Sequence, residues 1–345
     1  MAALVYDVVI PTHGRNVELL MASVESVRTQ TLPPRTIVIV VDAIEEVAQR
    51  IRTMWPTLVV LRIGPGAGPA DARTAGVIAS TSPWVCFVDD DDLWHHDKML
   101  VTAQYLGAHP GCMAVRSTFW VFSTHSDHLS VLNELRVDMF GSTLVELEEA
   151  AIVRQPITPF EYLRIEGDSL GLLLERNRGV IGSTCVRRSI LESIPAVPSG
   201  TRPGDDHVLF CLVATRAEWH LIDTPLLFYR LHPDQDTRQA DPATSRRIIQ
   251  SRIIAWQLCS DRAPRPLSTY GRTYRREFRP ALWSLLIRGH VGEWVRTYRA
   301  ATQLMPRWRD RVMVCVPEPL AWRWRHRWSP VARARVASSS AVSSA

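Results

Sequence analysis

Apolar runs alternate with helical patterns through the first part of the chain. The runs that predict strands lie at residues 7–10, 37–41, 58–63 and 85–88. Apolar positions with helical spacing lie between them, at residues 17–28, 45–54 and 70–79. Because wholly apolar runs are typical of parallel strands buried on both faces, this alternation predicts an α/β fold. We expect a mostly parallel sheet with right-handed crossovers.

The pattern is less regular in the rest of the chain. Helices are expected at residues 97–108, 189–194 and 205–214, and strands at 113–123, at the end of 178–187 and at 220–229. Residues 125–175 show no clear pattern, and 245–303 are mostly helical. We therefore predict a main domain at residues 1–240 with halves 1–110 and 111–240, a helical extension at 241–330 and a disordered Ser/Ala/Val-rich tail at 331–345.

The composition and the cysteine spacing indicate the cellular compartment of the protein. With 345 residues and 46% apolar content, the chain can form one large domain with an extension. It has no run of about 18 apolar residues, so we expect no membrane-spanning helix. The N-terminus lacks the pattern of a secretory signal. The six cysteines form no C-x-x-C pair, so we expect reduced cysteines in a cytoplasmic protein.

The net charge of +5 is unevenly distributed. Residues 262–335 hold 17 arginines against four acids, an excess of 13 positive charges, so the rest of the chain carries −8. Trp and Arg interleave in this basic part, at residues 306–311 and 322–328. Three interpretations stay open: docking on an anionic membrane surface, packing within a helical extension or an oligomer, and nucleic-acid binding, which is the least favoured.

Four consecutive aspartates, at residues 89–92, follow the predicted strand at 85–88. Adjacent carboxylates repel one another, so their pKa values should rise unless a cation lies among them. A hard divalent cation, which prefers oxygen ligands, would remove the conflict. The alternative interpretation is a solvated acidic turn.

Other strand ends also carry polar groups, at Pro11-Thr12, at Asp42 and at residues 230–232. The first two and the acidic run should share one edge of a parallel sheet, where open α/β sheets bind nucleotides. The loop at 64–69 lacks the Gly-Lys-Ser/Thr ending of a phosphate-binding loop. We therefore expect a metal, not a glycine-rich cradle, to neutralise the phosphates.

The ordered set of motifs resembles the family-two glycosyltransferases, which are inverting enzymes with the GT-A fold. The matching segments lie at residues 8–15, 30–42, 72–76, 87–94, 204–206 and 229–232. The resemblance covers roughly residues 5–235. It implies a GT-A type fold, with a Rossmann-like, mostly parallel sheet flanked by helices and here followed by the helical C-terminal extension.

The resemblance also implies roles on the nucleotide side. Asp42 would accept a hydrogen bond from uracil N3–H, for which an acceptor-only carboxylate is suited; the alternative is a helix cap. Asp89 would contact the ribose, and Arg73 would lie near the nucleotide unless it forms a surface ion pair. The remaining nucleotide-binding candidates are Pro11 and Thr12 beside the base, Arg15 near the phosphates, and Asp90.

Asp91 would bind Mn²⁺ or Mg²⁺, which bridges the two phosphates and offsets the charge on the leaving group. His232 is a candidate further ligand or diphosphate contact, with a structural role as the alternative. Asp92 lies outside the motif, and we expect it to cap the following helix.

Inversion needs one base opposite the leaving group. Asp206 aligns with the family's catalytic Asp, and Asp205 stands where Glu is usual, so either is a candidate. A pair of acids favoured by the helix dipole is the alternative. On the acceptor side we expect Gly182 and Ser183, and Trp94 either beneath the sugar or in the core.

These assignments predict transfer of a sugar from a nucleotide-diphosphate sugar to a hydroxyl acceptor, with inversion, in glycan, cell-envelope or glycoconjugate biosynthesis. A UDP donor is favoured, although dTDP presents the same edge. The acceptor would be a saccharide or a lipid-linked glycan, and the enzyme cytoplasmic or peripheral at the inner face of the cell membrane. The alternatives are a sugar nucleotidyltransferase and a non-catalytic nucleotide-sugar-binding protein.

Overall fold

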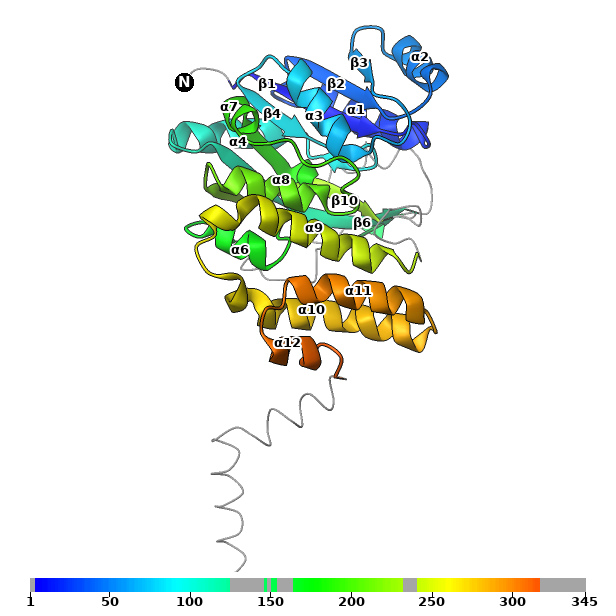
Figure 1. The fold of residues 1–345 in the computed structure, drawn as a ribbon. Helices are drawn as coiled ribbons and strands as arrows, with labels where there is room; N and C mark the ends of the chain where they lie inside the picture. Colours follow the sequence, from blue (N-terminus) through cyan, green and yellow to red (C-terminus); the bar gives the residue numbers. More distant parts are fainter. Residues whose placement is uncertain (1–3, 125–145, 148–149, 154–163, 232–240, 317–345) are drawn as a thin grey trace, which may run out of the picture. The chain divides into compact units, whose positions relative to one another are not determined.

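The computed structural model describes residues 4–124, 146–147, 150–153, 164–231 and 241–316 (Figure 1). The chain forms two compact units, residues 1–240 with 250–264, and residues 241–249 with 265–345. His232 lies outside the described residues, and every other predicted site residue lies in the first unit.

The first half of the sheet is parallel, as the apolar runs predict. Its strands are β1 (Tyr6–Thr12), β2 (Thr36–Val41), β3 (Val59–Arg62) and β4 (Trp84–Phe87), in the order β3-β2-β1-β4. The helices between them are α1 (Val17–Arg28), α2 (Glu45–Met54) and α3 (Pro69–Ala79). Figure 1 shows α3 crossing β1 and β2, on which it packs.

The second half of the sheet is mixed. β6 (Ala114–Thr124) and β10 (Trp219–Leu231) are parallel to each other, but β9 (Thr184–Arg187) lies between β4 and β6 and is antiparallel to both. β5 (Leu93–Trp94) pairs antiparallel with β10. β8 (Ala150–Val153) adds antiparallel pairs with β6 and with β7 (Glu146–Leu147).

The remaining helices of the first unit lie around this mixed half. They are α4 (Lys98–Ala108), α6 (Ser169–Glu175), α7 (Arg188–Ser193) and α8 (Asp205–Ala214), with 3-10 turns at η2 (Ile181–Ser183) and η3 (Ser260–Arg262). Helix α9 (Thr244–Cys259) runs from the second unit into the first. The second unit contains α10 (Leu267–Ile287), α11 (Val291–Gln303) and α12 (Trp308–Met313).

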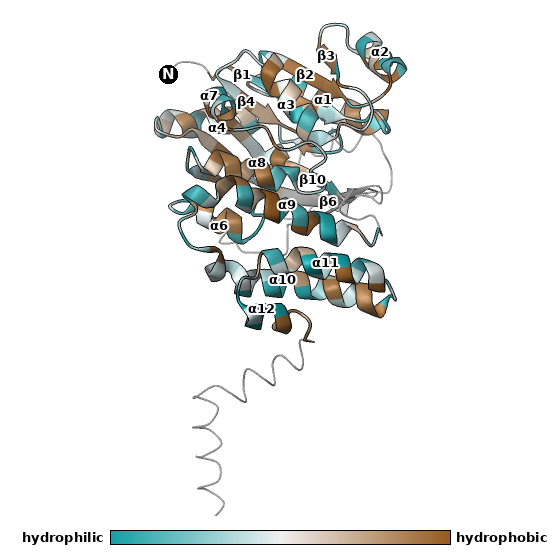
Figure 2. Cartoon of the chain, in the orientation of Figure 1, coloured by the Kyte–Doolittle hydropathy of each residue, from teal (hydrophilic) through white to brown (hydrophobic). Residues whose placement is uncertain are grey.

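The core is formed by the apolar strands that the sequence predicts. Val8 and Ile10 of β1, and Ile39 of β2, are fully buried, and Figure 2 shows the centre of this sheet as hydrophobic. The six cysteines are free thiols, and five of them are buried. Among the described residues, no helix is both long and apolar enough to cross a membrane.

Helix α3 approaches β1 closely because position 76 has no side chain. A Cβ atom on Gly76 would lie 2.3 Å from Cγ1 of Val9, which is fully buried. The same helix carries Arg73, so this close packing also sets the depth at which the arginine enters the site.

We expect Gly76→Ala to lower the free energy of unfolding by about 1–3 kcal/mol, because the methyl group overpacks the contact with Val9. Chemical denaturation with urea measures this. Gly111→Ala is the control, since its Cβ would meet nothing within 4 Å. Equal stabilities for the two variants would show that α3 does not need this close approach.

Candidate functional site

Three strand ends meet at one edge of the parallel half-sheet, as predicted. The Asp42 amide donates to the carbonyl of Thr12 at 2.8 Å, directly after β2 and β1 end. The Thr12 hydroxyl donates to the carboxylate of Asp90, which follows β4. The Ser23 hydroxyl, on α1, donates to the carbonyl of Asp89 at 3.0 Å. The edge therefore gathers an alcohol and several carboxylates from separate parts of the chain.

Asp42 holds the glycine-rich loop that leads into α3. Its carboxylate oxygens accept the amides of Ala67 at 3.0 Å and Gly68 at 2.8 Å. Gly68 is the N-terminal cap of α3 with φ of 91°, a left-handed conformation that favours glycine. The alternative that Asp42 caps the next helix is wrong, because α2 is capped at Ile44 without a side-chain bond.

His13 is a site residue that the motif comparison missed. Its Nδ1 lies 3.4 Å from Oδ2 of Asp42, and its Nε2 lies 2.7 Å from Nη1 of Arg202. The imidazole thus connects the end of β1 with the loop before α8. Its position in the sequence, directly after Pro11-Thr12, is the signal that could have identified it.

The first two aspartates of the acidic run have different partners. Asp89 Oδ1 accepts from Nη2 of Arg73 at 2.6 Å, but burial still raises its pKa above the usual range, because Arg73 only partly offsets the desolvation. Burial, together with repulsion from Asp91, raises the pKa of Asp90 to about 7. The run is therefore not a solvated acidic turn, and it is short of positive charge.

Asp92 is fully buried, which corrects its predicted role as a helix cap. Its Oδ1 accepts the amide of Arg230 at 3.0 Å, whereas α4 has Asp97 at its cap position. The Oδ2 atom has no hydrogen-bond partner among the described residues, and burial raises the pKa of this carboxyl well above the usual range. Asp92 therefore joins the acidic run to the end of β10.

Arg73 joins the acidic run to helix α8. Its guanidinium donates to Asp89 and also to Oδ2 of Asp205, in the first turn of α8. Because the arginine is buried, the predicted alternative of a surface ion pair is wrong. Burial raises the pKa of Asp205 to about 6 even though Arg73 opposes the shift. The positive charge of Arg73 therefore offsets only part of the desolvation of Asp89 and Asp205.

The two acids of α8 are not equivalent. Asp206 is half-buried, and its contacts with described residues are weak or local: Nδ2 of Asn177 lies 3.4 Å away, and the neighbouring amide of His207 donates at 2.7 Å. The residue at the N-cap of the helix is Gly204, which has φ of 103°. A Cβ atom there would lie 2.4 Å from Oγ of Ser251, so the turn that presents both acids requires glycine.

The predicted acceptor-side residues are buried. Trp94 is 2% exposed, packs in the core and donates from Nε1 to the carbonyl of Gly182 at 2.9 Å, which matches the core alternative. The Ser183 carbonyl accepts from Lys98 Nζ at 2.9 Å, and burial lowers the pKa of this lysine to about 8. These contacts fix Gly182 and Ser183 next to Asp92. The Oδ2 atom of Asp92 lies 3.3 Å from the position that a Cβ atom on Gly182 would take.

The remaining predicted residues lie around the same edge. Pro11 is buried in β1, and Arg15 is exposed after it. Arg230, at the end of β10, donates from Nε to the carbonyl of Asp91 at 2.8 Å. The structure thus brings the acidic run, Arg73 and both acids of α8 together.

A divalent cation fits the donor set of the acidic run. Its carboxylate oxygens are hard ligands of the kind that Mn²⁺ and Mg²⁺ prefer. The pKa values of Asp89 and Asp90 are raised. The positive charge of the described residues, mainly that of Arg73, therefore does not neutralise the carboxylates of the acidic run.

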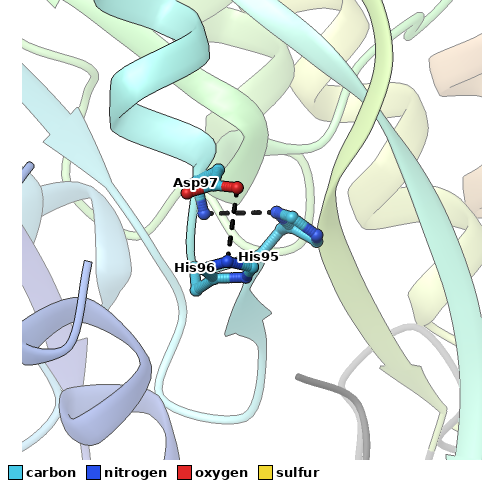
Figure 3. A group of neighbouring side chains, drawn as sticks. All are labelled: His95, His96 and Asp97. Carbon is cyan, nitrogen blue, oxygen red and sulfur yellow. Dashed lines mark hydrogen bonds and ion pairs between the residues drawn. The ribbon is translucent and has the colours of Figure 1, made fainter. Parts of the chain in front are cut away.

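A second group of possible metal ligands, His95, His96 and Asp97, lies between β5 and α4 (Figure 3). Their ligand atoms lie within 4.8 Å of one another. However, His95 Nδ1 accepts the Asp97 amide at 3.2 Å, and His96 Nε2 lies 3.2 Å from Asp97 Oδ2. Burial lowers the pKa of His95 to about 4. These contacts account for the cluster as the turn that begins α4.

Comparisons with known proteins identify relatives of this chain. Residues 7–142 match the model of the family described as glycosyl transferase family 2. An uncharacterized glycosyltransferase of Haemophilus influenzae is 21% identical over 70% of this chain and 74% of its own length. Uncharacterized glycosyltransferase YwdF of Bacillus subtilis is 35% identical over 27% of this chain and 36% of its own length.

Solved structures show the same fold. The S. aureus TarS 1-349 crystal structure in complex with UDP-GlcNAc has a TM-score of 0.57 at 13% identity, covering 88% of this chain and 82% of that one. A second TarS 1-349 structure has a TM-score of 0.52 at 14% identity, with 88% and 81% covered. The GT-A type fold and the family resemblance are therefore confirmed.

We expect Arg73→Met to lower the free energy of unfolding by about 3 kcal/mol, because it leaves two partly or fully buried carboxylates without their cation. The loss should shrink as pH falls from 8 to 5. Arg73 lowers the pKa values of Asp89 and Asp205, so its removal raises them further in the folded variant, and protonation then stabilises the variant more than the wild type. Denaturant unfolding at each pH measures both effects.

The matched control is Arg28→Met, which breaks an exposed ion pair with Glu25. We expect a loss below about 1 kcal/mol with little change between pH 8 and 5. A pH-independent loss for Arg73→Met would instead indicate that the arginine acts only through packing of its stem.

Proposed function

We propose, from the membership of residues 7–142 in glycosyl transferase family 2, that this protein transfers a sugar from a nucleotide-diphosphate sugar to a hydroxyl acceptor with inversion. The observation that carries the proposal is the convergence of Asp42, the acidic run and the acids of α8 on one edge, with Arg73 between the last two. A nucleotide and an acceptor could be held on either side of that arginine.

We assign the general base to Asp206. The Asp205 carboxylate is bound by Arg73, whereas Asp206 is half-buried and has no ion pair among the described contacts. In this mechanism Asp206 takes the proton of the acceptor hydroxyl as its oxygen attacks the anomeric carbon. The bond to the diphosphate oxygen breaks, and the nucleoside diphosphate leaves with the bonding electrons.

On the donor side, Asp42 contacts the base and Asp89 the ribose. The Asp42 carboxylate uses two of its lone pairs on the amides of Ala67 and Gly68, which leaves acceptor capacity for a uracil N3–H. Thr12 and Pro11 border the base, and Arg15, which is exposed, reaches for the phosphates. The UDP-GlcNAc bound to TarS supports a UDP-type donor for this fold.

Asp91 would hold Mn²⁺ or Mg²⁺. The bound metal would supply positive charge to the leaving diphosphate. The Thr12 hydroxyl donates to Asp90, and the Arg73 guanidinium donates to Asp89. These contacts position the two aspartates that precede the metal ligand. We further propose a cytoplasmic enzyme with a saccharide or lipid-linked glycan as acceptor, in cell-envelope or related glycan synthesis.

The test is metal-dependent turnover of nucleotide sugars. We expect slow release of UDP, or of another nucleoside diphosphate, from one sugar donor in the presence of Mn²⁺. Release of pyrophosphate would instead indicate a nucleotidyltransferase, and binding without any turnover would indicate a non-catalytic protein.

Two substitutions separate the roles. Asp206→Asn should lower transfer by about 10²–10⁴-fold while donor binding persists, because only the base is lost. Asp91→Asn should remove Mn²⁺ binding, measured by calorimetry, together with turnover. Asp97→Asn is the control, and it should leave Mn²⁺ binding intact. If Asp97→Asn, and not Asp91→Asn, removed Mn²⁺ binding, the metal would belong to the His95–Asp97 turn.

A further inference from the structure

Helix α12 exposes two large apolar side chains on one face. Trp308 is 69% exposed and Val312 is 52% exposed, and their spacing of four residues places them side by side on the helix. Figure 2 shows polar and apolar segments next to each other along α12. An exposed apolar group that is rimmed by polar residues is a feature of surfaces that contact a partner or a membrane.

The opposite face of α12 is fixed to α10. Asp310 is buried, and its Oδ1 lies 2.9 Å from Nη1 of Arg275. Arg279 donates from Nη2 to the carbonyl of Met313 at 2.8 Å. Because these contacts fix the buried face of α12 to α10, Trp308 and Val312 lie on the exposed face of the helix.

Three arginines surround the apolar pair. Arg307, Arg309 and Arg311 are exposed, and none forms an ion pair with a described acid. The guanidinium of Arg309 lies 5.8 Å from the ring centre of Trp308. We call Trp308, Val312 and these three arginines the α12 face.

The acids of the second unit do not balance this charge. Its described residues, 241–249 and 265–316, hold 13 arginines against four acids. Three of those acids, Asp241, Glu293 and Asp310, are already paired with other arginines. The α12 face therefore carries an excess of positive charge, which would attract an anionic surface.

We infer that the α12 face docks the protein on an anionic lipid surface. Trp308 and Val312 would enter the boundary between headgroups and acyl chains, and the arginines would bind lipid phosphates. A second copy of the chain is a poor partner, because two such faces would oppose like charges. The Trp/Arg alternation recurs in the sequence at residues 322–328, which lie outside the described residues.

Vesicle co-sedimentation of the full-length protein tests the inference, with phosphatidylglycerol–phosphatidylcholine vesicles against pure phosphatidylcholine. We expect binding only to the anionic vesicles, weakened by added salt. The variant W308S/V312S should bind about tenfold more weakly. The variant R307Q/R309Q should lose about fivefold in affinity per arginine.

The matched control is I287S/V291S, which removes an equally exposed apolar pair at the α10–α11 turn (Figure 1). That turn is far along α10 from the positions that hold α12, near residues 275–279. All variants should keep the wild-type rate of donor turnover and the wild-type Tm. Unchanged binding of W308S/V312S, or an equal loss with I287S/V291S, would overturn the assignment. So would a change in oligomeric mass, without lipid, for W308S/V312S alone.

Discussion

One buried guanidinium connects the two chemical halves of the site. Arg73 reaches Asp89 at the end of β4 and Asp205 at the start of α8, and these acids come from distant parts of the chain. Taking three charged groups out of water is costly unless their geometry is good. The surrounding packing meets that condition: Gly76 lets α3 approach β1, and Gly204 allows the turn that presents Asp205.

The cost of removing charged groups from water also applies to the acidic run. Four adjacent carboxylates cannot all be charged and buried without separate partners, and the fold supplies different ones: Arg73 for Asp89, a hydroxyl for Asp90 and a backbone amide for Asp92. The raised pKa values of these three groups show that the compensation is incomplete. This electrostatic deficit is the property that makes the edge suitable for a divalent cation.

The sequence predicts the parallel half of the fold well, because each β-α unit there carries its own periodicity and its neighbours in sequence are neighbours in space. The mixed half was harder, because the place of β9 between β4 and β6 depends on pairings between distant residues. The same limit applies to the site. Burial of Trp94 and Asp92, and the contact of His13 with Asp42 and Arg202, follow from tertiary packing that local pattern does not contain.

The choice between Asp205 and Asp206 shows how tertiary contacts complete a motif. Both are adjacent acids in the first turn of one helix, so sequence and helix dipole treat them alike. Arg73 breaks the symmetry, since it binds one carboxylate and leaves the other beside the neutral amide of Asn177. A carboxylate oxygen that is bound by a buried arginine is less available to an acceptor hydroxyl than one that faces only an amide. In the mechanism that we propose, the arginine that appears in the motif as a nucleotide neighbour therefore also determines which acid is available as the base.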